Sequence, residues 1–144
     1  MVLTNTFGEL SAGALESFES RTGLVLPDSY GDFLLAFNGG QPIPNEADVP
    51  NQQPVIVDLL YGICDTRIPG DLQYEMSRRG DLHSKGFIPI GHDPGGNTFL
   101  LGLFGTQAGR VFYWDSCLFF DGSDEQHNTY PLATSIGELL SSLH

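Results

Sequence analysis

The chain has 144 residues, 40% of them hydrophobic, and a net charge of −12 from 18 acidic and 6 basic side chains. This length and composition predict one globular domain over residues 1–144, with a core large enough to fold without a disulfide or a metal ion. The charge argues against binding to nucleic-acid phosphates or to an anionic membrane surface, because six scattered cations cannot form a basic patch. It permits a guided encounter with a basic protein, although acidity for solubility alone would look the same.

The first residues, MVLTNTFGEL, lack the basic and then apolar pattern of a secretory signal. No apolar run approaches the ~18 residues that a membrane-spanning helix needs. Cys64 and Cys117 follow no metal-binding or disulfide pattern. We therefore expect a cytoplasmic protein whose thiols are reduced.

Two helices are predicted near the N-terminus. Residues 10–22 form the first, with Ser11 as its N-cap and Gly23 as its stop. Residues 27–38 form the second, with Pro27 at its first position. Its apolar stripe consists of Tyr30, Phe33, Leu34 and Phe37. The apolar linker, residues 24–26, is expected to enter the core.

The next third of the chain is more irregular. Residues 41–54 contain four prolines and predict an extended loop rather than a helix or a central strand. Residues 55–61, VIVDLLY, predict a strand with Asp58 on its wetter face. Residues 71–79 predict a short helix whose apolar pair is Leu72 and Met76.

Residues 87–115 predict the centre of the fold. Three apolar segments, residues 87–91, 98–103 and 110–114, are separated by two short runs of turn residues. Turns this short make the three strands antiparallel neighbours. Most of one sheet is therefore encoded in a single continuous stretch.

The C-terminal part begins with a predicted short strand at residues 117–120 and an acidic exposed loop at residues 121–128. A final helix follows, with the capping-box pair Ser135 and Glu138. Its predicted stripe is Leu132, Ile136, Leu139, Leu140 and Leu143. The order of elements predicts an α+β fold, with a mainly antiparallel sheet of four or more strands covered by about four helices.

Four segments of the chain together resemble the SUKH superfamily, most closely its branch related to fungal cell-wall assembly regulators. They are LPDSYGDFLLAFNGG (26–40), YGI (61–63), FIPIGHDPGGNTFLL (87–101) and GRVFYWD (109–115). The resemblance covers nearly the whole chain and implies an α+β fold. The matching residues that we expect to determine this fold include Pro27, Tyr30, Asn38, Gly39, Gly40, Gly91, Asp93, Gly96, Asn97 and Gly109.

The resemblance also implies a function. Bacterial members of the superfamily are mostly interpreted as immunity proteins that bind and neutralise a cognate polymorphic toxin, often a nuclease. The eukaryotic regulators carry long disordered flanks, so this chain is similar to the compact bacterial kind. The family supplies no catalytic set and no cofactor. The fungal relatives suggest an alternative, a cytosolic adaptor or regulatory scaffold that binds an endogenous protein.

The residues give little sign of catalysis. His92 and Asp93 form the only adjacent His/Asp pair, and a small hydrolase or ligand-binding module built on them is a third hypothesis. An aspartate before Pro-Gly-Gly is, however, what a turn requires, since its carboxylate can accept from backbone N–H groups two residues on. No spaced Cys/His set accompanies the pair, and DPGGN lacks the lysine of a phosphate-binding loop. We therefore predict a protein with no catalytic residue, no metal and no cofactor.

Seven residues are candidates for contact with a partner. Five are acids in two loops, and two are aromatic residues able to anchor an interface if they are partly exposed. They are Glu46, Asp48, Asp121, Asp124, Glu125, Tyr61 and Trp114. Acids on one rim would suit a basic toxin domain, while solvated loops and a tryptophan packed in the core are the simpler alternatives. We expect a monomer or weak dimer with a protein partner.

Overall fold

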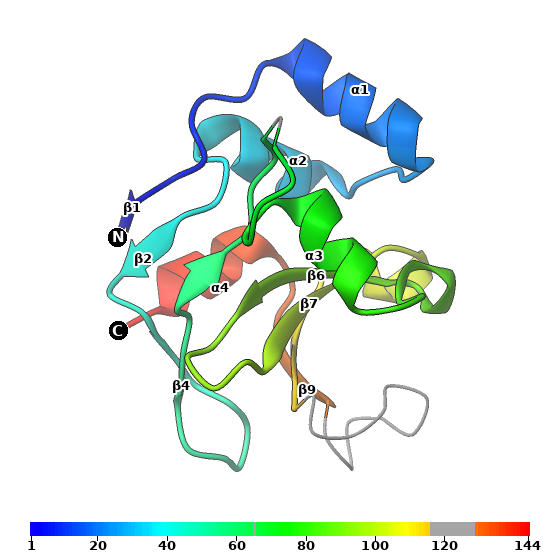
Figure 1. Cartoon of the computed structure of the whole chain (residues 1–144). Coiled ribbons are helices and arrows are strands. Elements are labelled where there is room, and N and C mark those ends of the chain that lie inside the picture. The colour runs from blue at the N-terminus through cyan, green and yellow to red at the C-terminus, as the bar shows by residue number, and fades with distance from the viewer. Residues whose placement is uncertain (65, 116–128) are drawn as a thin grey trace.

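The computed structural model describes residues 1–64, 66–115 and 129–144. A five-stranded antiparallel sheet of order β5-β6-β7-β8-β9 lies at its centre (Figure 1). Its strands are β5 (Leu59–Leu60), β6 (Phe87–His92), β7 (Thr98–Gly102), β8 (Val111–Trp114) and β9 (Thr129–Ala133). The three central strands that the sequence predicts are confirmed, because tight turns connect consecutive neighbours.

The sheet buries both of its faces. Phe99 pairs with Tyr113 and Leu100 pairs with Phe112 across β7 and β8. Since successive side chains in a strand point to opposite faces, these two pairs lie on opposite sides. The first pair belongs to the main core and the second to a smaller core, which also includes Leu82.

Helices supply the rest of the main core. They are α1 (Ala12–Thr22), α2 (Asp28–Ala36), α3 (Leu72–Arg78) and α4 (Ile136–Ser142). Each contributes a buried side chain, of which Phe18, Leu34, Leu72 and Leu139 are examples. Two 3-10 turns, η1 (His83–Lys85) and η2 (Gly105–Gln107), complete the helical elements of the described residues. The predicted α+β class is confirmed.

Helix ends follow the predicted capping chemistry. The Ser11 hydroxyl accepts from the N–H of Ala14 at 3.1 Å, and Gly23 ends α1 with φ of 75°. The Ser135 hydroxyl accepts from the N–H of Glu138 at 3.0 Å. Pro27 differs slightly from its predicted place, because it is the N-cap of α2 rather than its first residue.

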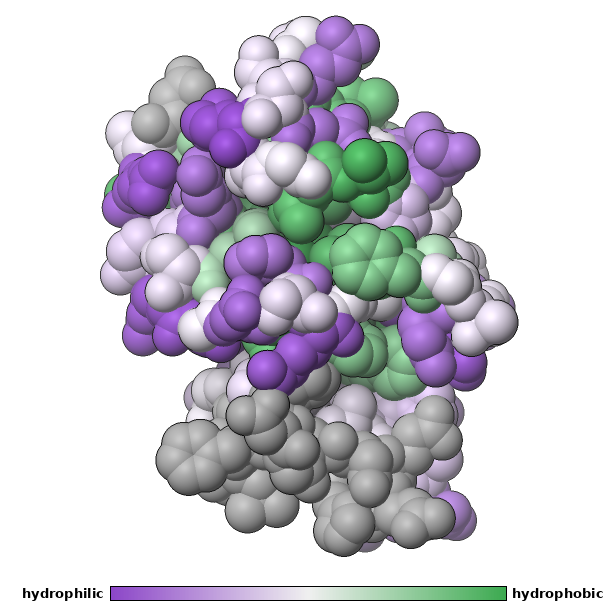
Figure 2. Space-filling view, turned by 90° about the vertical axis from the view of Figure 1, so that its right-hand side faces the viewer, coloured by the Kyte–Doolittle hydropathy of each residue, from purple (hydrophilic) through white to green (hydrophobic). Residues whose placement is uncertain are grey.

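The predicted linker of residues 24–26 only partly enters the core. Leu24 and Leu26 are buried, whereas the side chain of Val25 between them is exposed. Two of the three consecutive apolar residues of the linker therefore join the core, and the middle one faces water. Figure 2 shows one face of the molecule on which hydrophobic side chains gather among hydrophilic ones.

Short strands correct the prediction for residues 41–61. The expected plain loop holds β2 (Gln41–Ile43), which pairs with β1 (Val2–Thr4), and β3 (Glu46–Ala47), which pairs with β4 (Val55–Ile56). The expected strand over 55–61 is divided between β4 and β5, which belong to different sheets. Strands of two or three residues in two-stranded sheets tolerate prolines within or beside them, which a central strand would not.

The C-terminal prediction is corrected too. Leu132 lies in β9 and not on the final helix, which begins at Ile136. The predictions for residues 117–120 and 121–128 fall outside the described residues. Among the described helices, we find none whose length and apolar character would let it cross a membrane.

Candidate functional site

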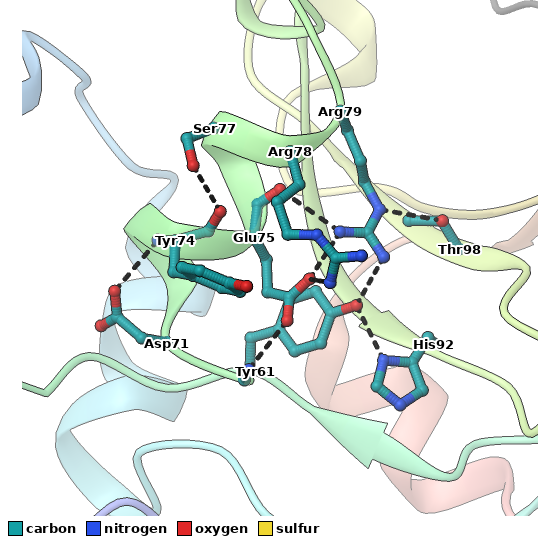
Figure 3. Close-up of polar contacts among 10 residues, drawn as sticks. Tyr61, Asp71, Tyr74, Glu75, Ser77, Arg78, Arg79, His92 and Thr98 are labelled. Carbon is teal, nitrogen blue, oxygen red and sulfur yellow. Dashed lines mark hydrogen bonds and ion pairs between the residues drawn. The ribbon is translucent and has the colours of Figure 1, made fainter. Parts of the chain in front are cut away.

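A polar cluster lies between helix α3 and the sheet (Figure 3). We call it the α3 cluster and define it as Tyr61, Glu75, Arg79, His92 and Thr98. Glu75 and Arg79 lie one turn apart, on α3 and at its C-cap. His92 and Thr98 face each other in the pairing of β6 with β7, and Tyr61 directly follows β5. Neighbouring strands and one helix therefore bring together residues that are far apart in the sequence.

Arg79 is the centre of the cluster. Its Nη1 lies 2.6 Å from Glu75 Oε1, its Nε donates to Thr98 Oγ1 at 3.2 Å, and its Nη2 donates to the Tyr61 hydroxyl at 3.1 Å. The side chain of Glu75 is 2% exposed and that of Arg79 is 17% exposed. Arg78, which is 56% exposed, approaches the same carboxylate only to 3.7 Å. The buried charge of Glu75 is therefore neutralised within the protein.

Glu75 remains ionised despite its burial. Desolvation alone would raise the pKa of its carboxyl group. The N–H of Gly70 donates to Oε2 at 2.8 Å, and the hydrogen bond from Arg79 and the charges of both arginines add to this. These effects outweigh desolvation and hold the pKa of Glu75 below its ordinary value.

Tyr61 and His92 form the sheet side of the cluster. Burial raises the pKa of the Tyr61 hydroxyl, so it stays protonated in spite of the nearby arginine. Because Arg79 donates to this oxygen, the Tyr61 proton is free to go to His92 Nδ1, 2.9 Å away. The other ring nitrogen of His92, Nε2, lies 3.8 Å from the Asp58 carboxylate.

The α3 cluster is suited to holding α3 on the sheet rather than to catalysis. Tyr61 is fully buried, and Arg79 already contacts three side chains. The adjoining hollow of about 300 Å³ is lined by Arg78, Arg79, Gly96, Thr98 and Trp114. None of these side chains is a nucleophile activated by a neighbouring base.

The turn after β6 contains a second polar group of residues. Asp93 Oδ1 accepts from the N–H of Asn97 at 2.9 Å, and Oδ2 accepts from the Tyr113 hydroxyl at 2.7 Å. The backbone donor lies four residues on, not two as predicted. His92 bonds to Tyr61 instead, so the His92–Asp93 pair of the hydrolase hypothesis does not act together. No group of three or more metal-ligating side chains is present among the described residues.

Comparison with known proteins assigns the chain to a family. The model of the SMI1 / KNR4 family (SUKH-1) matches residues 9–142. The chain belongs to this family. No curated protein and no solved structure gave a match. SUKH-1 membership supports a function of the immunity-protein kind and a protein partner at the family level.

Several residues that carried the SUKH resemblance occupy constrained positions. The Asn38 side chain donates to the carbonyl groups of Gly8 and Ile63 and accepts from the N–H of Ile63. A Cβ atom on Gly39 would lie 2.7 Å from the Leu60 carbonyl oxygen, and one on Gly91 would lie 2.6 Å from that of Leu59. Positive φ is adopted at Asn38, Gly39, Gly40, Gly96 and Gly109, and Tyr30 is fully buried. That these residues determine the fold of this SUKH-1 chain stays a prediction, which substitution at each position would test.

The predicted aromatic anchors are not exposed. Tyr61 is 0% exposed within the α3 cluster, and Trp114 is 7% exposed. Trp114 packs in the smaller core with Leu82, Leu100 and Phe112. The partial exposure that an anchor requires is absent, so the prediction that these two rings contact a partner of the SUKH-1 protein is corrected.

The predicted acids are placed only in part. Glu46 lies in β3, where its backbone pairs with that of His144, and the exposed Asp48 carboxylate lies 3.0 Å from His144 Nε2. This hydrogen bond and the charge of Asp48 raise the pKa of His144. Asp121, Asp124 and Glu125 are outside the described residues, so a shared acidic rim remains a prediction.

Sequence reasoning missed the partnership of Glu75 with Arg79. Their i, i+4 spacing on a predicted helix was the available signal, since such pairs are neighbours on a helix surface. A charged helix residue ordinarily faces water, however, and nothing local indicates that the carboxylate would turn toward the N–H of Gly70. The burial depends on how α3 meets β6 and β7, which is a long-range property.

Proposed function

We propose that this SUKH-1 protein is an immunity protein that binds a cognate polymorphic toxin in the cytoplasm and neutralises it by protein–protein contact. Membership of the family over residues 9–142 supports this class of function. The observation that carries the partner's chemistry is the excess of 18 acidic over 6 basic residues. One of those six cations, Arg79, is paired with buried Glu75, so the other 17 acidic and 5 basic residues still carry the whole net charge of −12.

An acidic surface is a suitable inhibitor of a nuclease. A nuclease holds phosphate in a basic site, and an acidic protein can occupy that site in place of the nucleic acid. The long-range electrostatic field of the acidic protein also raises its rate of association with a basic toxin, and added salt screens this effect. Inhibition of this kind needs no catalytic residue and no cofactor in the inhibitor.

Co-expression tests the proposal. A candidate toxin domain, identified by sequencing the genes on either side of this chain's gene, would be induced in cells with the chain, with an unrelated protein of similar size and charge, or with no second protein. We expect growth only with the chain, because the unrelated protein matches its charge but not its surface. Equal loss of growth in all three cultures would refute neutralisation.

The second candidate is an adaptor or regulatory scaffold that binds an endogenous protein. The resemblance of the chain to the branch related to fungal cell-wall assembly regulators favours it. A tagged chain isolated from its own cells separates the two functions, because an immunity protein would retain one basic toxin domain in stoichiometric amount. Stoichiometric retention of an endogenous protein, with no protection from the neighbouring toxin, would favour the adaptor.

A further inference from the structure

The C-terminal end of α2 is an apolar ridge between two hollows. We define the α2 ridge as Leu35, Ala36 and Phe37; Leu35 is 40% exposed and Phe37 is 41% exposed. On one side of the ridge, a surface hollow of about 340 Å³ lies between α2 and the first residues of α4. On the other, a hollow of about 420 Å³ separates α2 from residues 6–10. Ala36 and Phe37 line both hollows, so the ridge is their common wall.

The ridge results from an apolar stripe that is longer than the core it covers. Tyr30, Phe33 and Leu34 are buried, and Phe37 continues their stripe one turn further. Its ring lies 5.9 Å from that of Phe33 but stays half outside. Asn38 and Gly39 both adopt positive φ and are buried, so the chain turns inward immediately after the ridge. Exposed aromatic and aliphatic side chains beside hollows are typical of protein interaction sites.

Carboxylates accompany both hollows. Exposed Asp32 lines the hollow toward α4, and exposed Glu9 lines the other. Asp28, also exposed, lies one turn before Asp32 on the same helix. No lysine or arginine is among the described residues that line either hollow. A partner surface that complements this one is therefore apolar in its centre and basic at its margins.

We propose that the α2 ridge is the surface through which the chain holds its toxin, and that the toxin presents an amphipathic segment to it. Apolar side chains of that segment enter the two hollows on either side of Phe37, and its lysines or arginines pair with Glu9 and Asp32. The proposal rests on the proposed function and names the surface that performs it. A second copy of this chain is a poor occupant, because two faces with the same acidic margins repel each other.

Binding measurements on matched variants test the proposal. The probe is the candidate toxin domain identified for the co-expression test, catalytically inactivated and immobilised for surface plasmon resonance. The ridge variant is Phe37→Ser, and its control is Phe104→Ser, which removes an exposed phenylalanine from the turn after β7. Phe37→Ser should weaken binding at least about tenfold, and Phe104→Ser less than about twofold.

A charge variant gives a readout that does not depend on the aromatic ring. Glu9→Lys combined with Asp32→Lys should slow association about tenfold and flatten its dependence on salt. Its control is Glu16→Lys combined with Asp81→Lys, an equal change of charge at exposed sites that line neither hollow. Thermal unfolding of each variant, compared with its control, shows whether a loss of binding comes from a loss of folding.

Each result decides between the two proposals. Failure of the native chain to bind the probe would overturn both the function and the ridge. If the Phe37→Ser variant and the charge variant each weaken binding no more than their controls do, the ridge is overturned and the function is left intact. A native chain that dimerises, with dimers that Phe37→Ser abolishes while toxin binding persists, would assign the ridge to self-association instead.

Discussion

Replacement of Arg79 by alanine is the most informative perturbation of the α3 cluster. The change removes the close partner of Glu75, whose carboxylate would keep the N–H of Gly70 at 2.8 Å and the distant Arg78 at 3.7 Å. It also removes the donor to the Tyr61 hydroxyl. A buried carboxylate would then be left without adequate compensation.

The expected loss follows from the burial of the pair. Removal of one partner from a buried ion pair costs about 3–5 kcal/mol, and the 17% exposure of Arg79 lets water replace part of it, so we expect about 3 kcal/mol. Arg78→Ala is the matched control, because Arg78 faces the same carboxylate from an exposed position. Its loss should stay below about 1 kcal/mol, which is the usual limit for surface pairs.

Urea unfolding followed by the fluorescence of Trp114, the only tryptophan, measures both losses. Adding Glu75→Gln to Arg79→Ala should recover part of the stability, because the uncompensated charge disappears. Equal losses for the two arginine variants, or no recovery in the double variant, would refute the buried ion pair.

The pH dependence gives a further check on the same cluster. The pKa of Glu75 is lowered in the folded chain, so the unfolded chain binds the proton first as the pH falls. The stabilisation is therefore complete above the ordinary carboxyl pKa of 4.5 and is lost as the pH falls through the lowered folded value. Glu75→Gln should remove this part of the acid sensitivity, and an unchanged acid limb would contradict the assignment.

Three other predictions concern the turns and the C-terminus. Gly39→Ala should lower the free energy of unfolding in urea by more than about 3 kcal/mol, and Gly80→Ala by only about 1 kcal/mol. Both glycines have positive φ, but only Gly39 lacks space for a Cβ atom, so equal losses would contradict this reasoning. Asp93→Ala should lower the free energy of unfolding by about 2 kcal/mol, because the buried Tyr113 hydroxyl loses its charged hydrogen-bond partner. An unchanged midpoint of urea unfolding would contradict this role of Asp93. NMR titration should place the pKa of His144 above 6.5, and Asp48→Asn should lower this pKa. The stabilisation linked to the protonated imidazole is fully present below pH 6.5 and disappears as the pH rises through the raised pKa of the folded chain. An identical titration in the variant would exclude the contact with Asp48.

The local parts of the fold were predictable from the sequence. Turns rich in glycine between residues 87 and 114 join strands that pair with their immediate neighbours, so no long-range information is needed. Ser11 and Ser135 cap helices through donors only three residues away. In each case the residues that make the structure are adjacent in the chain.

The remaining elements depend on contacts that the sequence does not reveal. Residues 129–133 form β9, the edge strand that pairs with β8. Leu132 belongs to this strand, and its helical spacing from Ile136 is a coincidence. Trp114 alternates with Tyr113 along one strand, so one of the two must face away from the main core. A second core, supplied by Leu82 and its neighbours, covers that face and removes the tryptophan from the surface.

The function of the candidate site was harder to predict than the fold for the same reason. Acidity and family resemblance favour a binding protein, but the exposure of a given aromatic residue depends on what packs over it. Phe37 belongs to a stripe that predicts only core packing, yet the chain turns inward at Gly39 and leaves its ring half exposed. The surface that we infer for the partner therefore became visible only in three dimensions.

Calorimetric titration of the purified toxin domain with the purified chain, together with an assay of toxin activity, tests the proposed function most directly. We predict a 1:1 complex with a Kd of about 10 nM or tighter, weakened by added salt, and activity that falls linearly to zero at one equivalent. No heat of binding with full activity would contradict neutralisation by contact. Complete inactivation by much less than one equivalent would show that the chain acts by turnover instead.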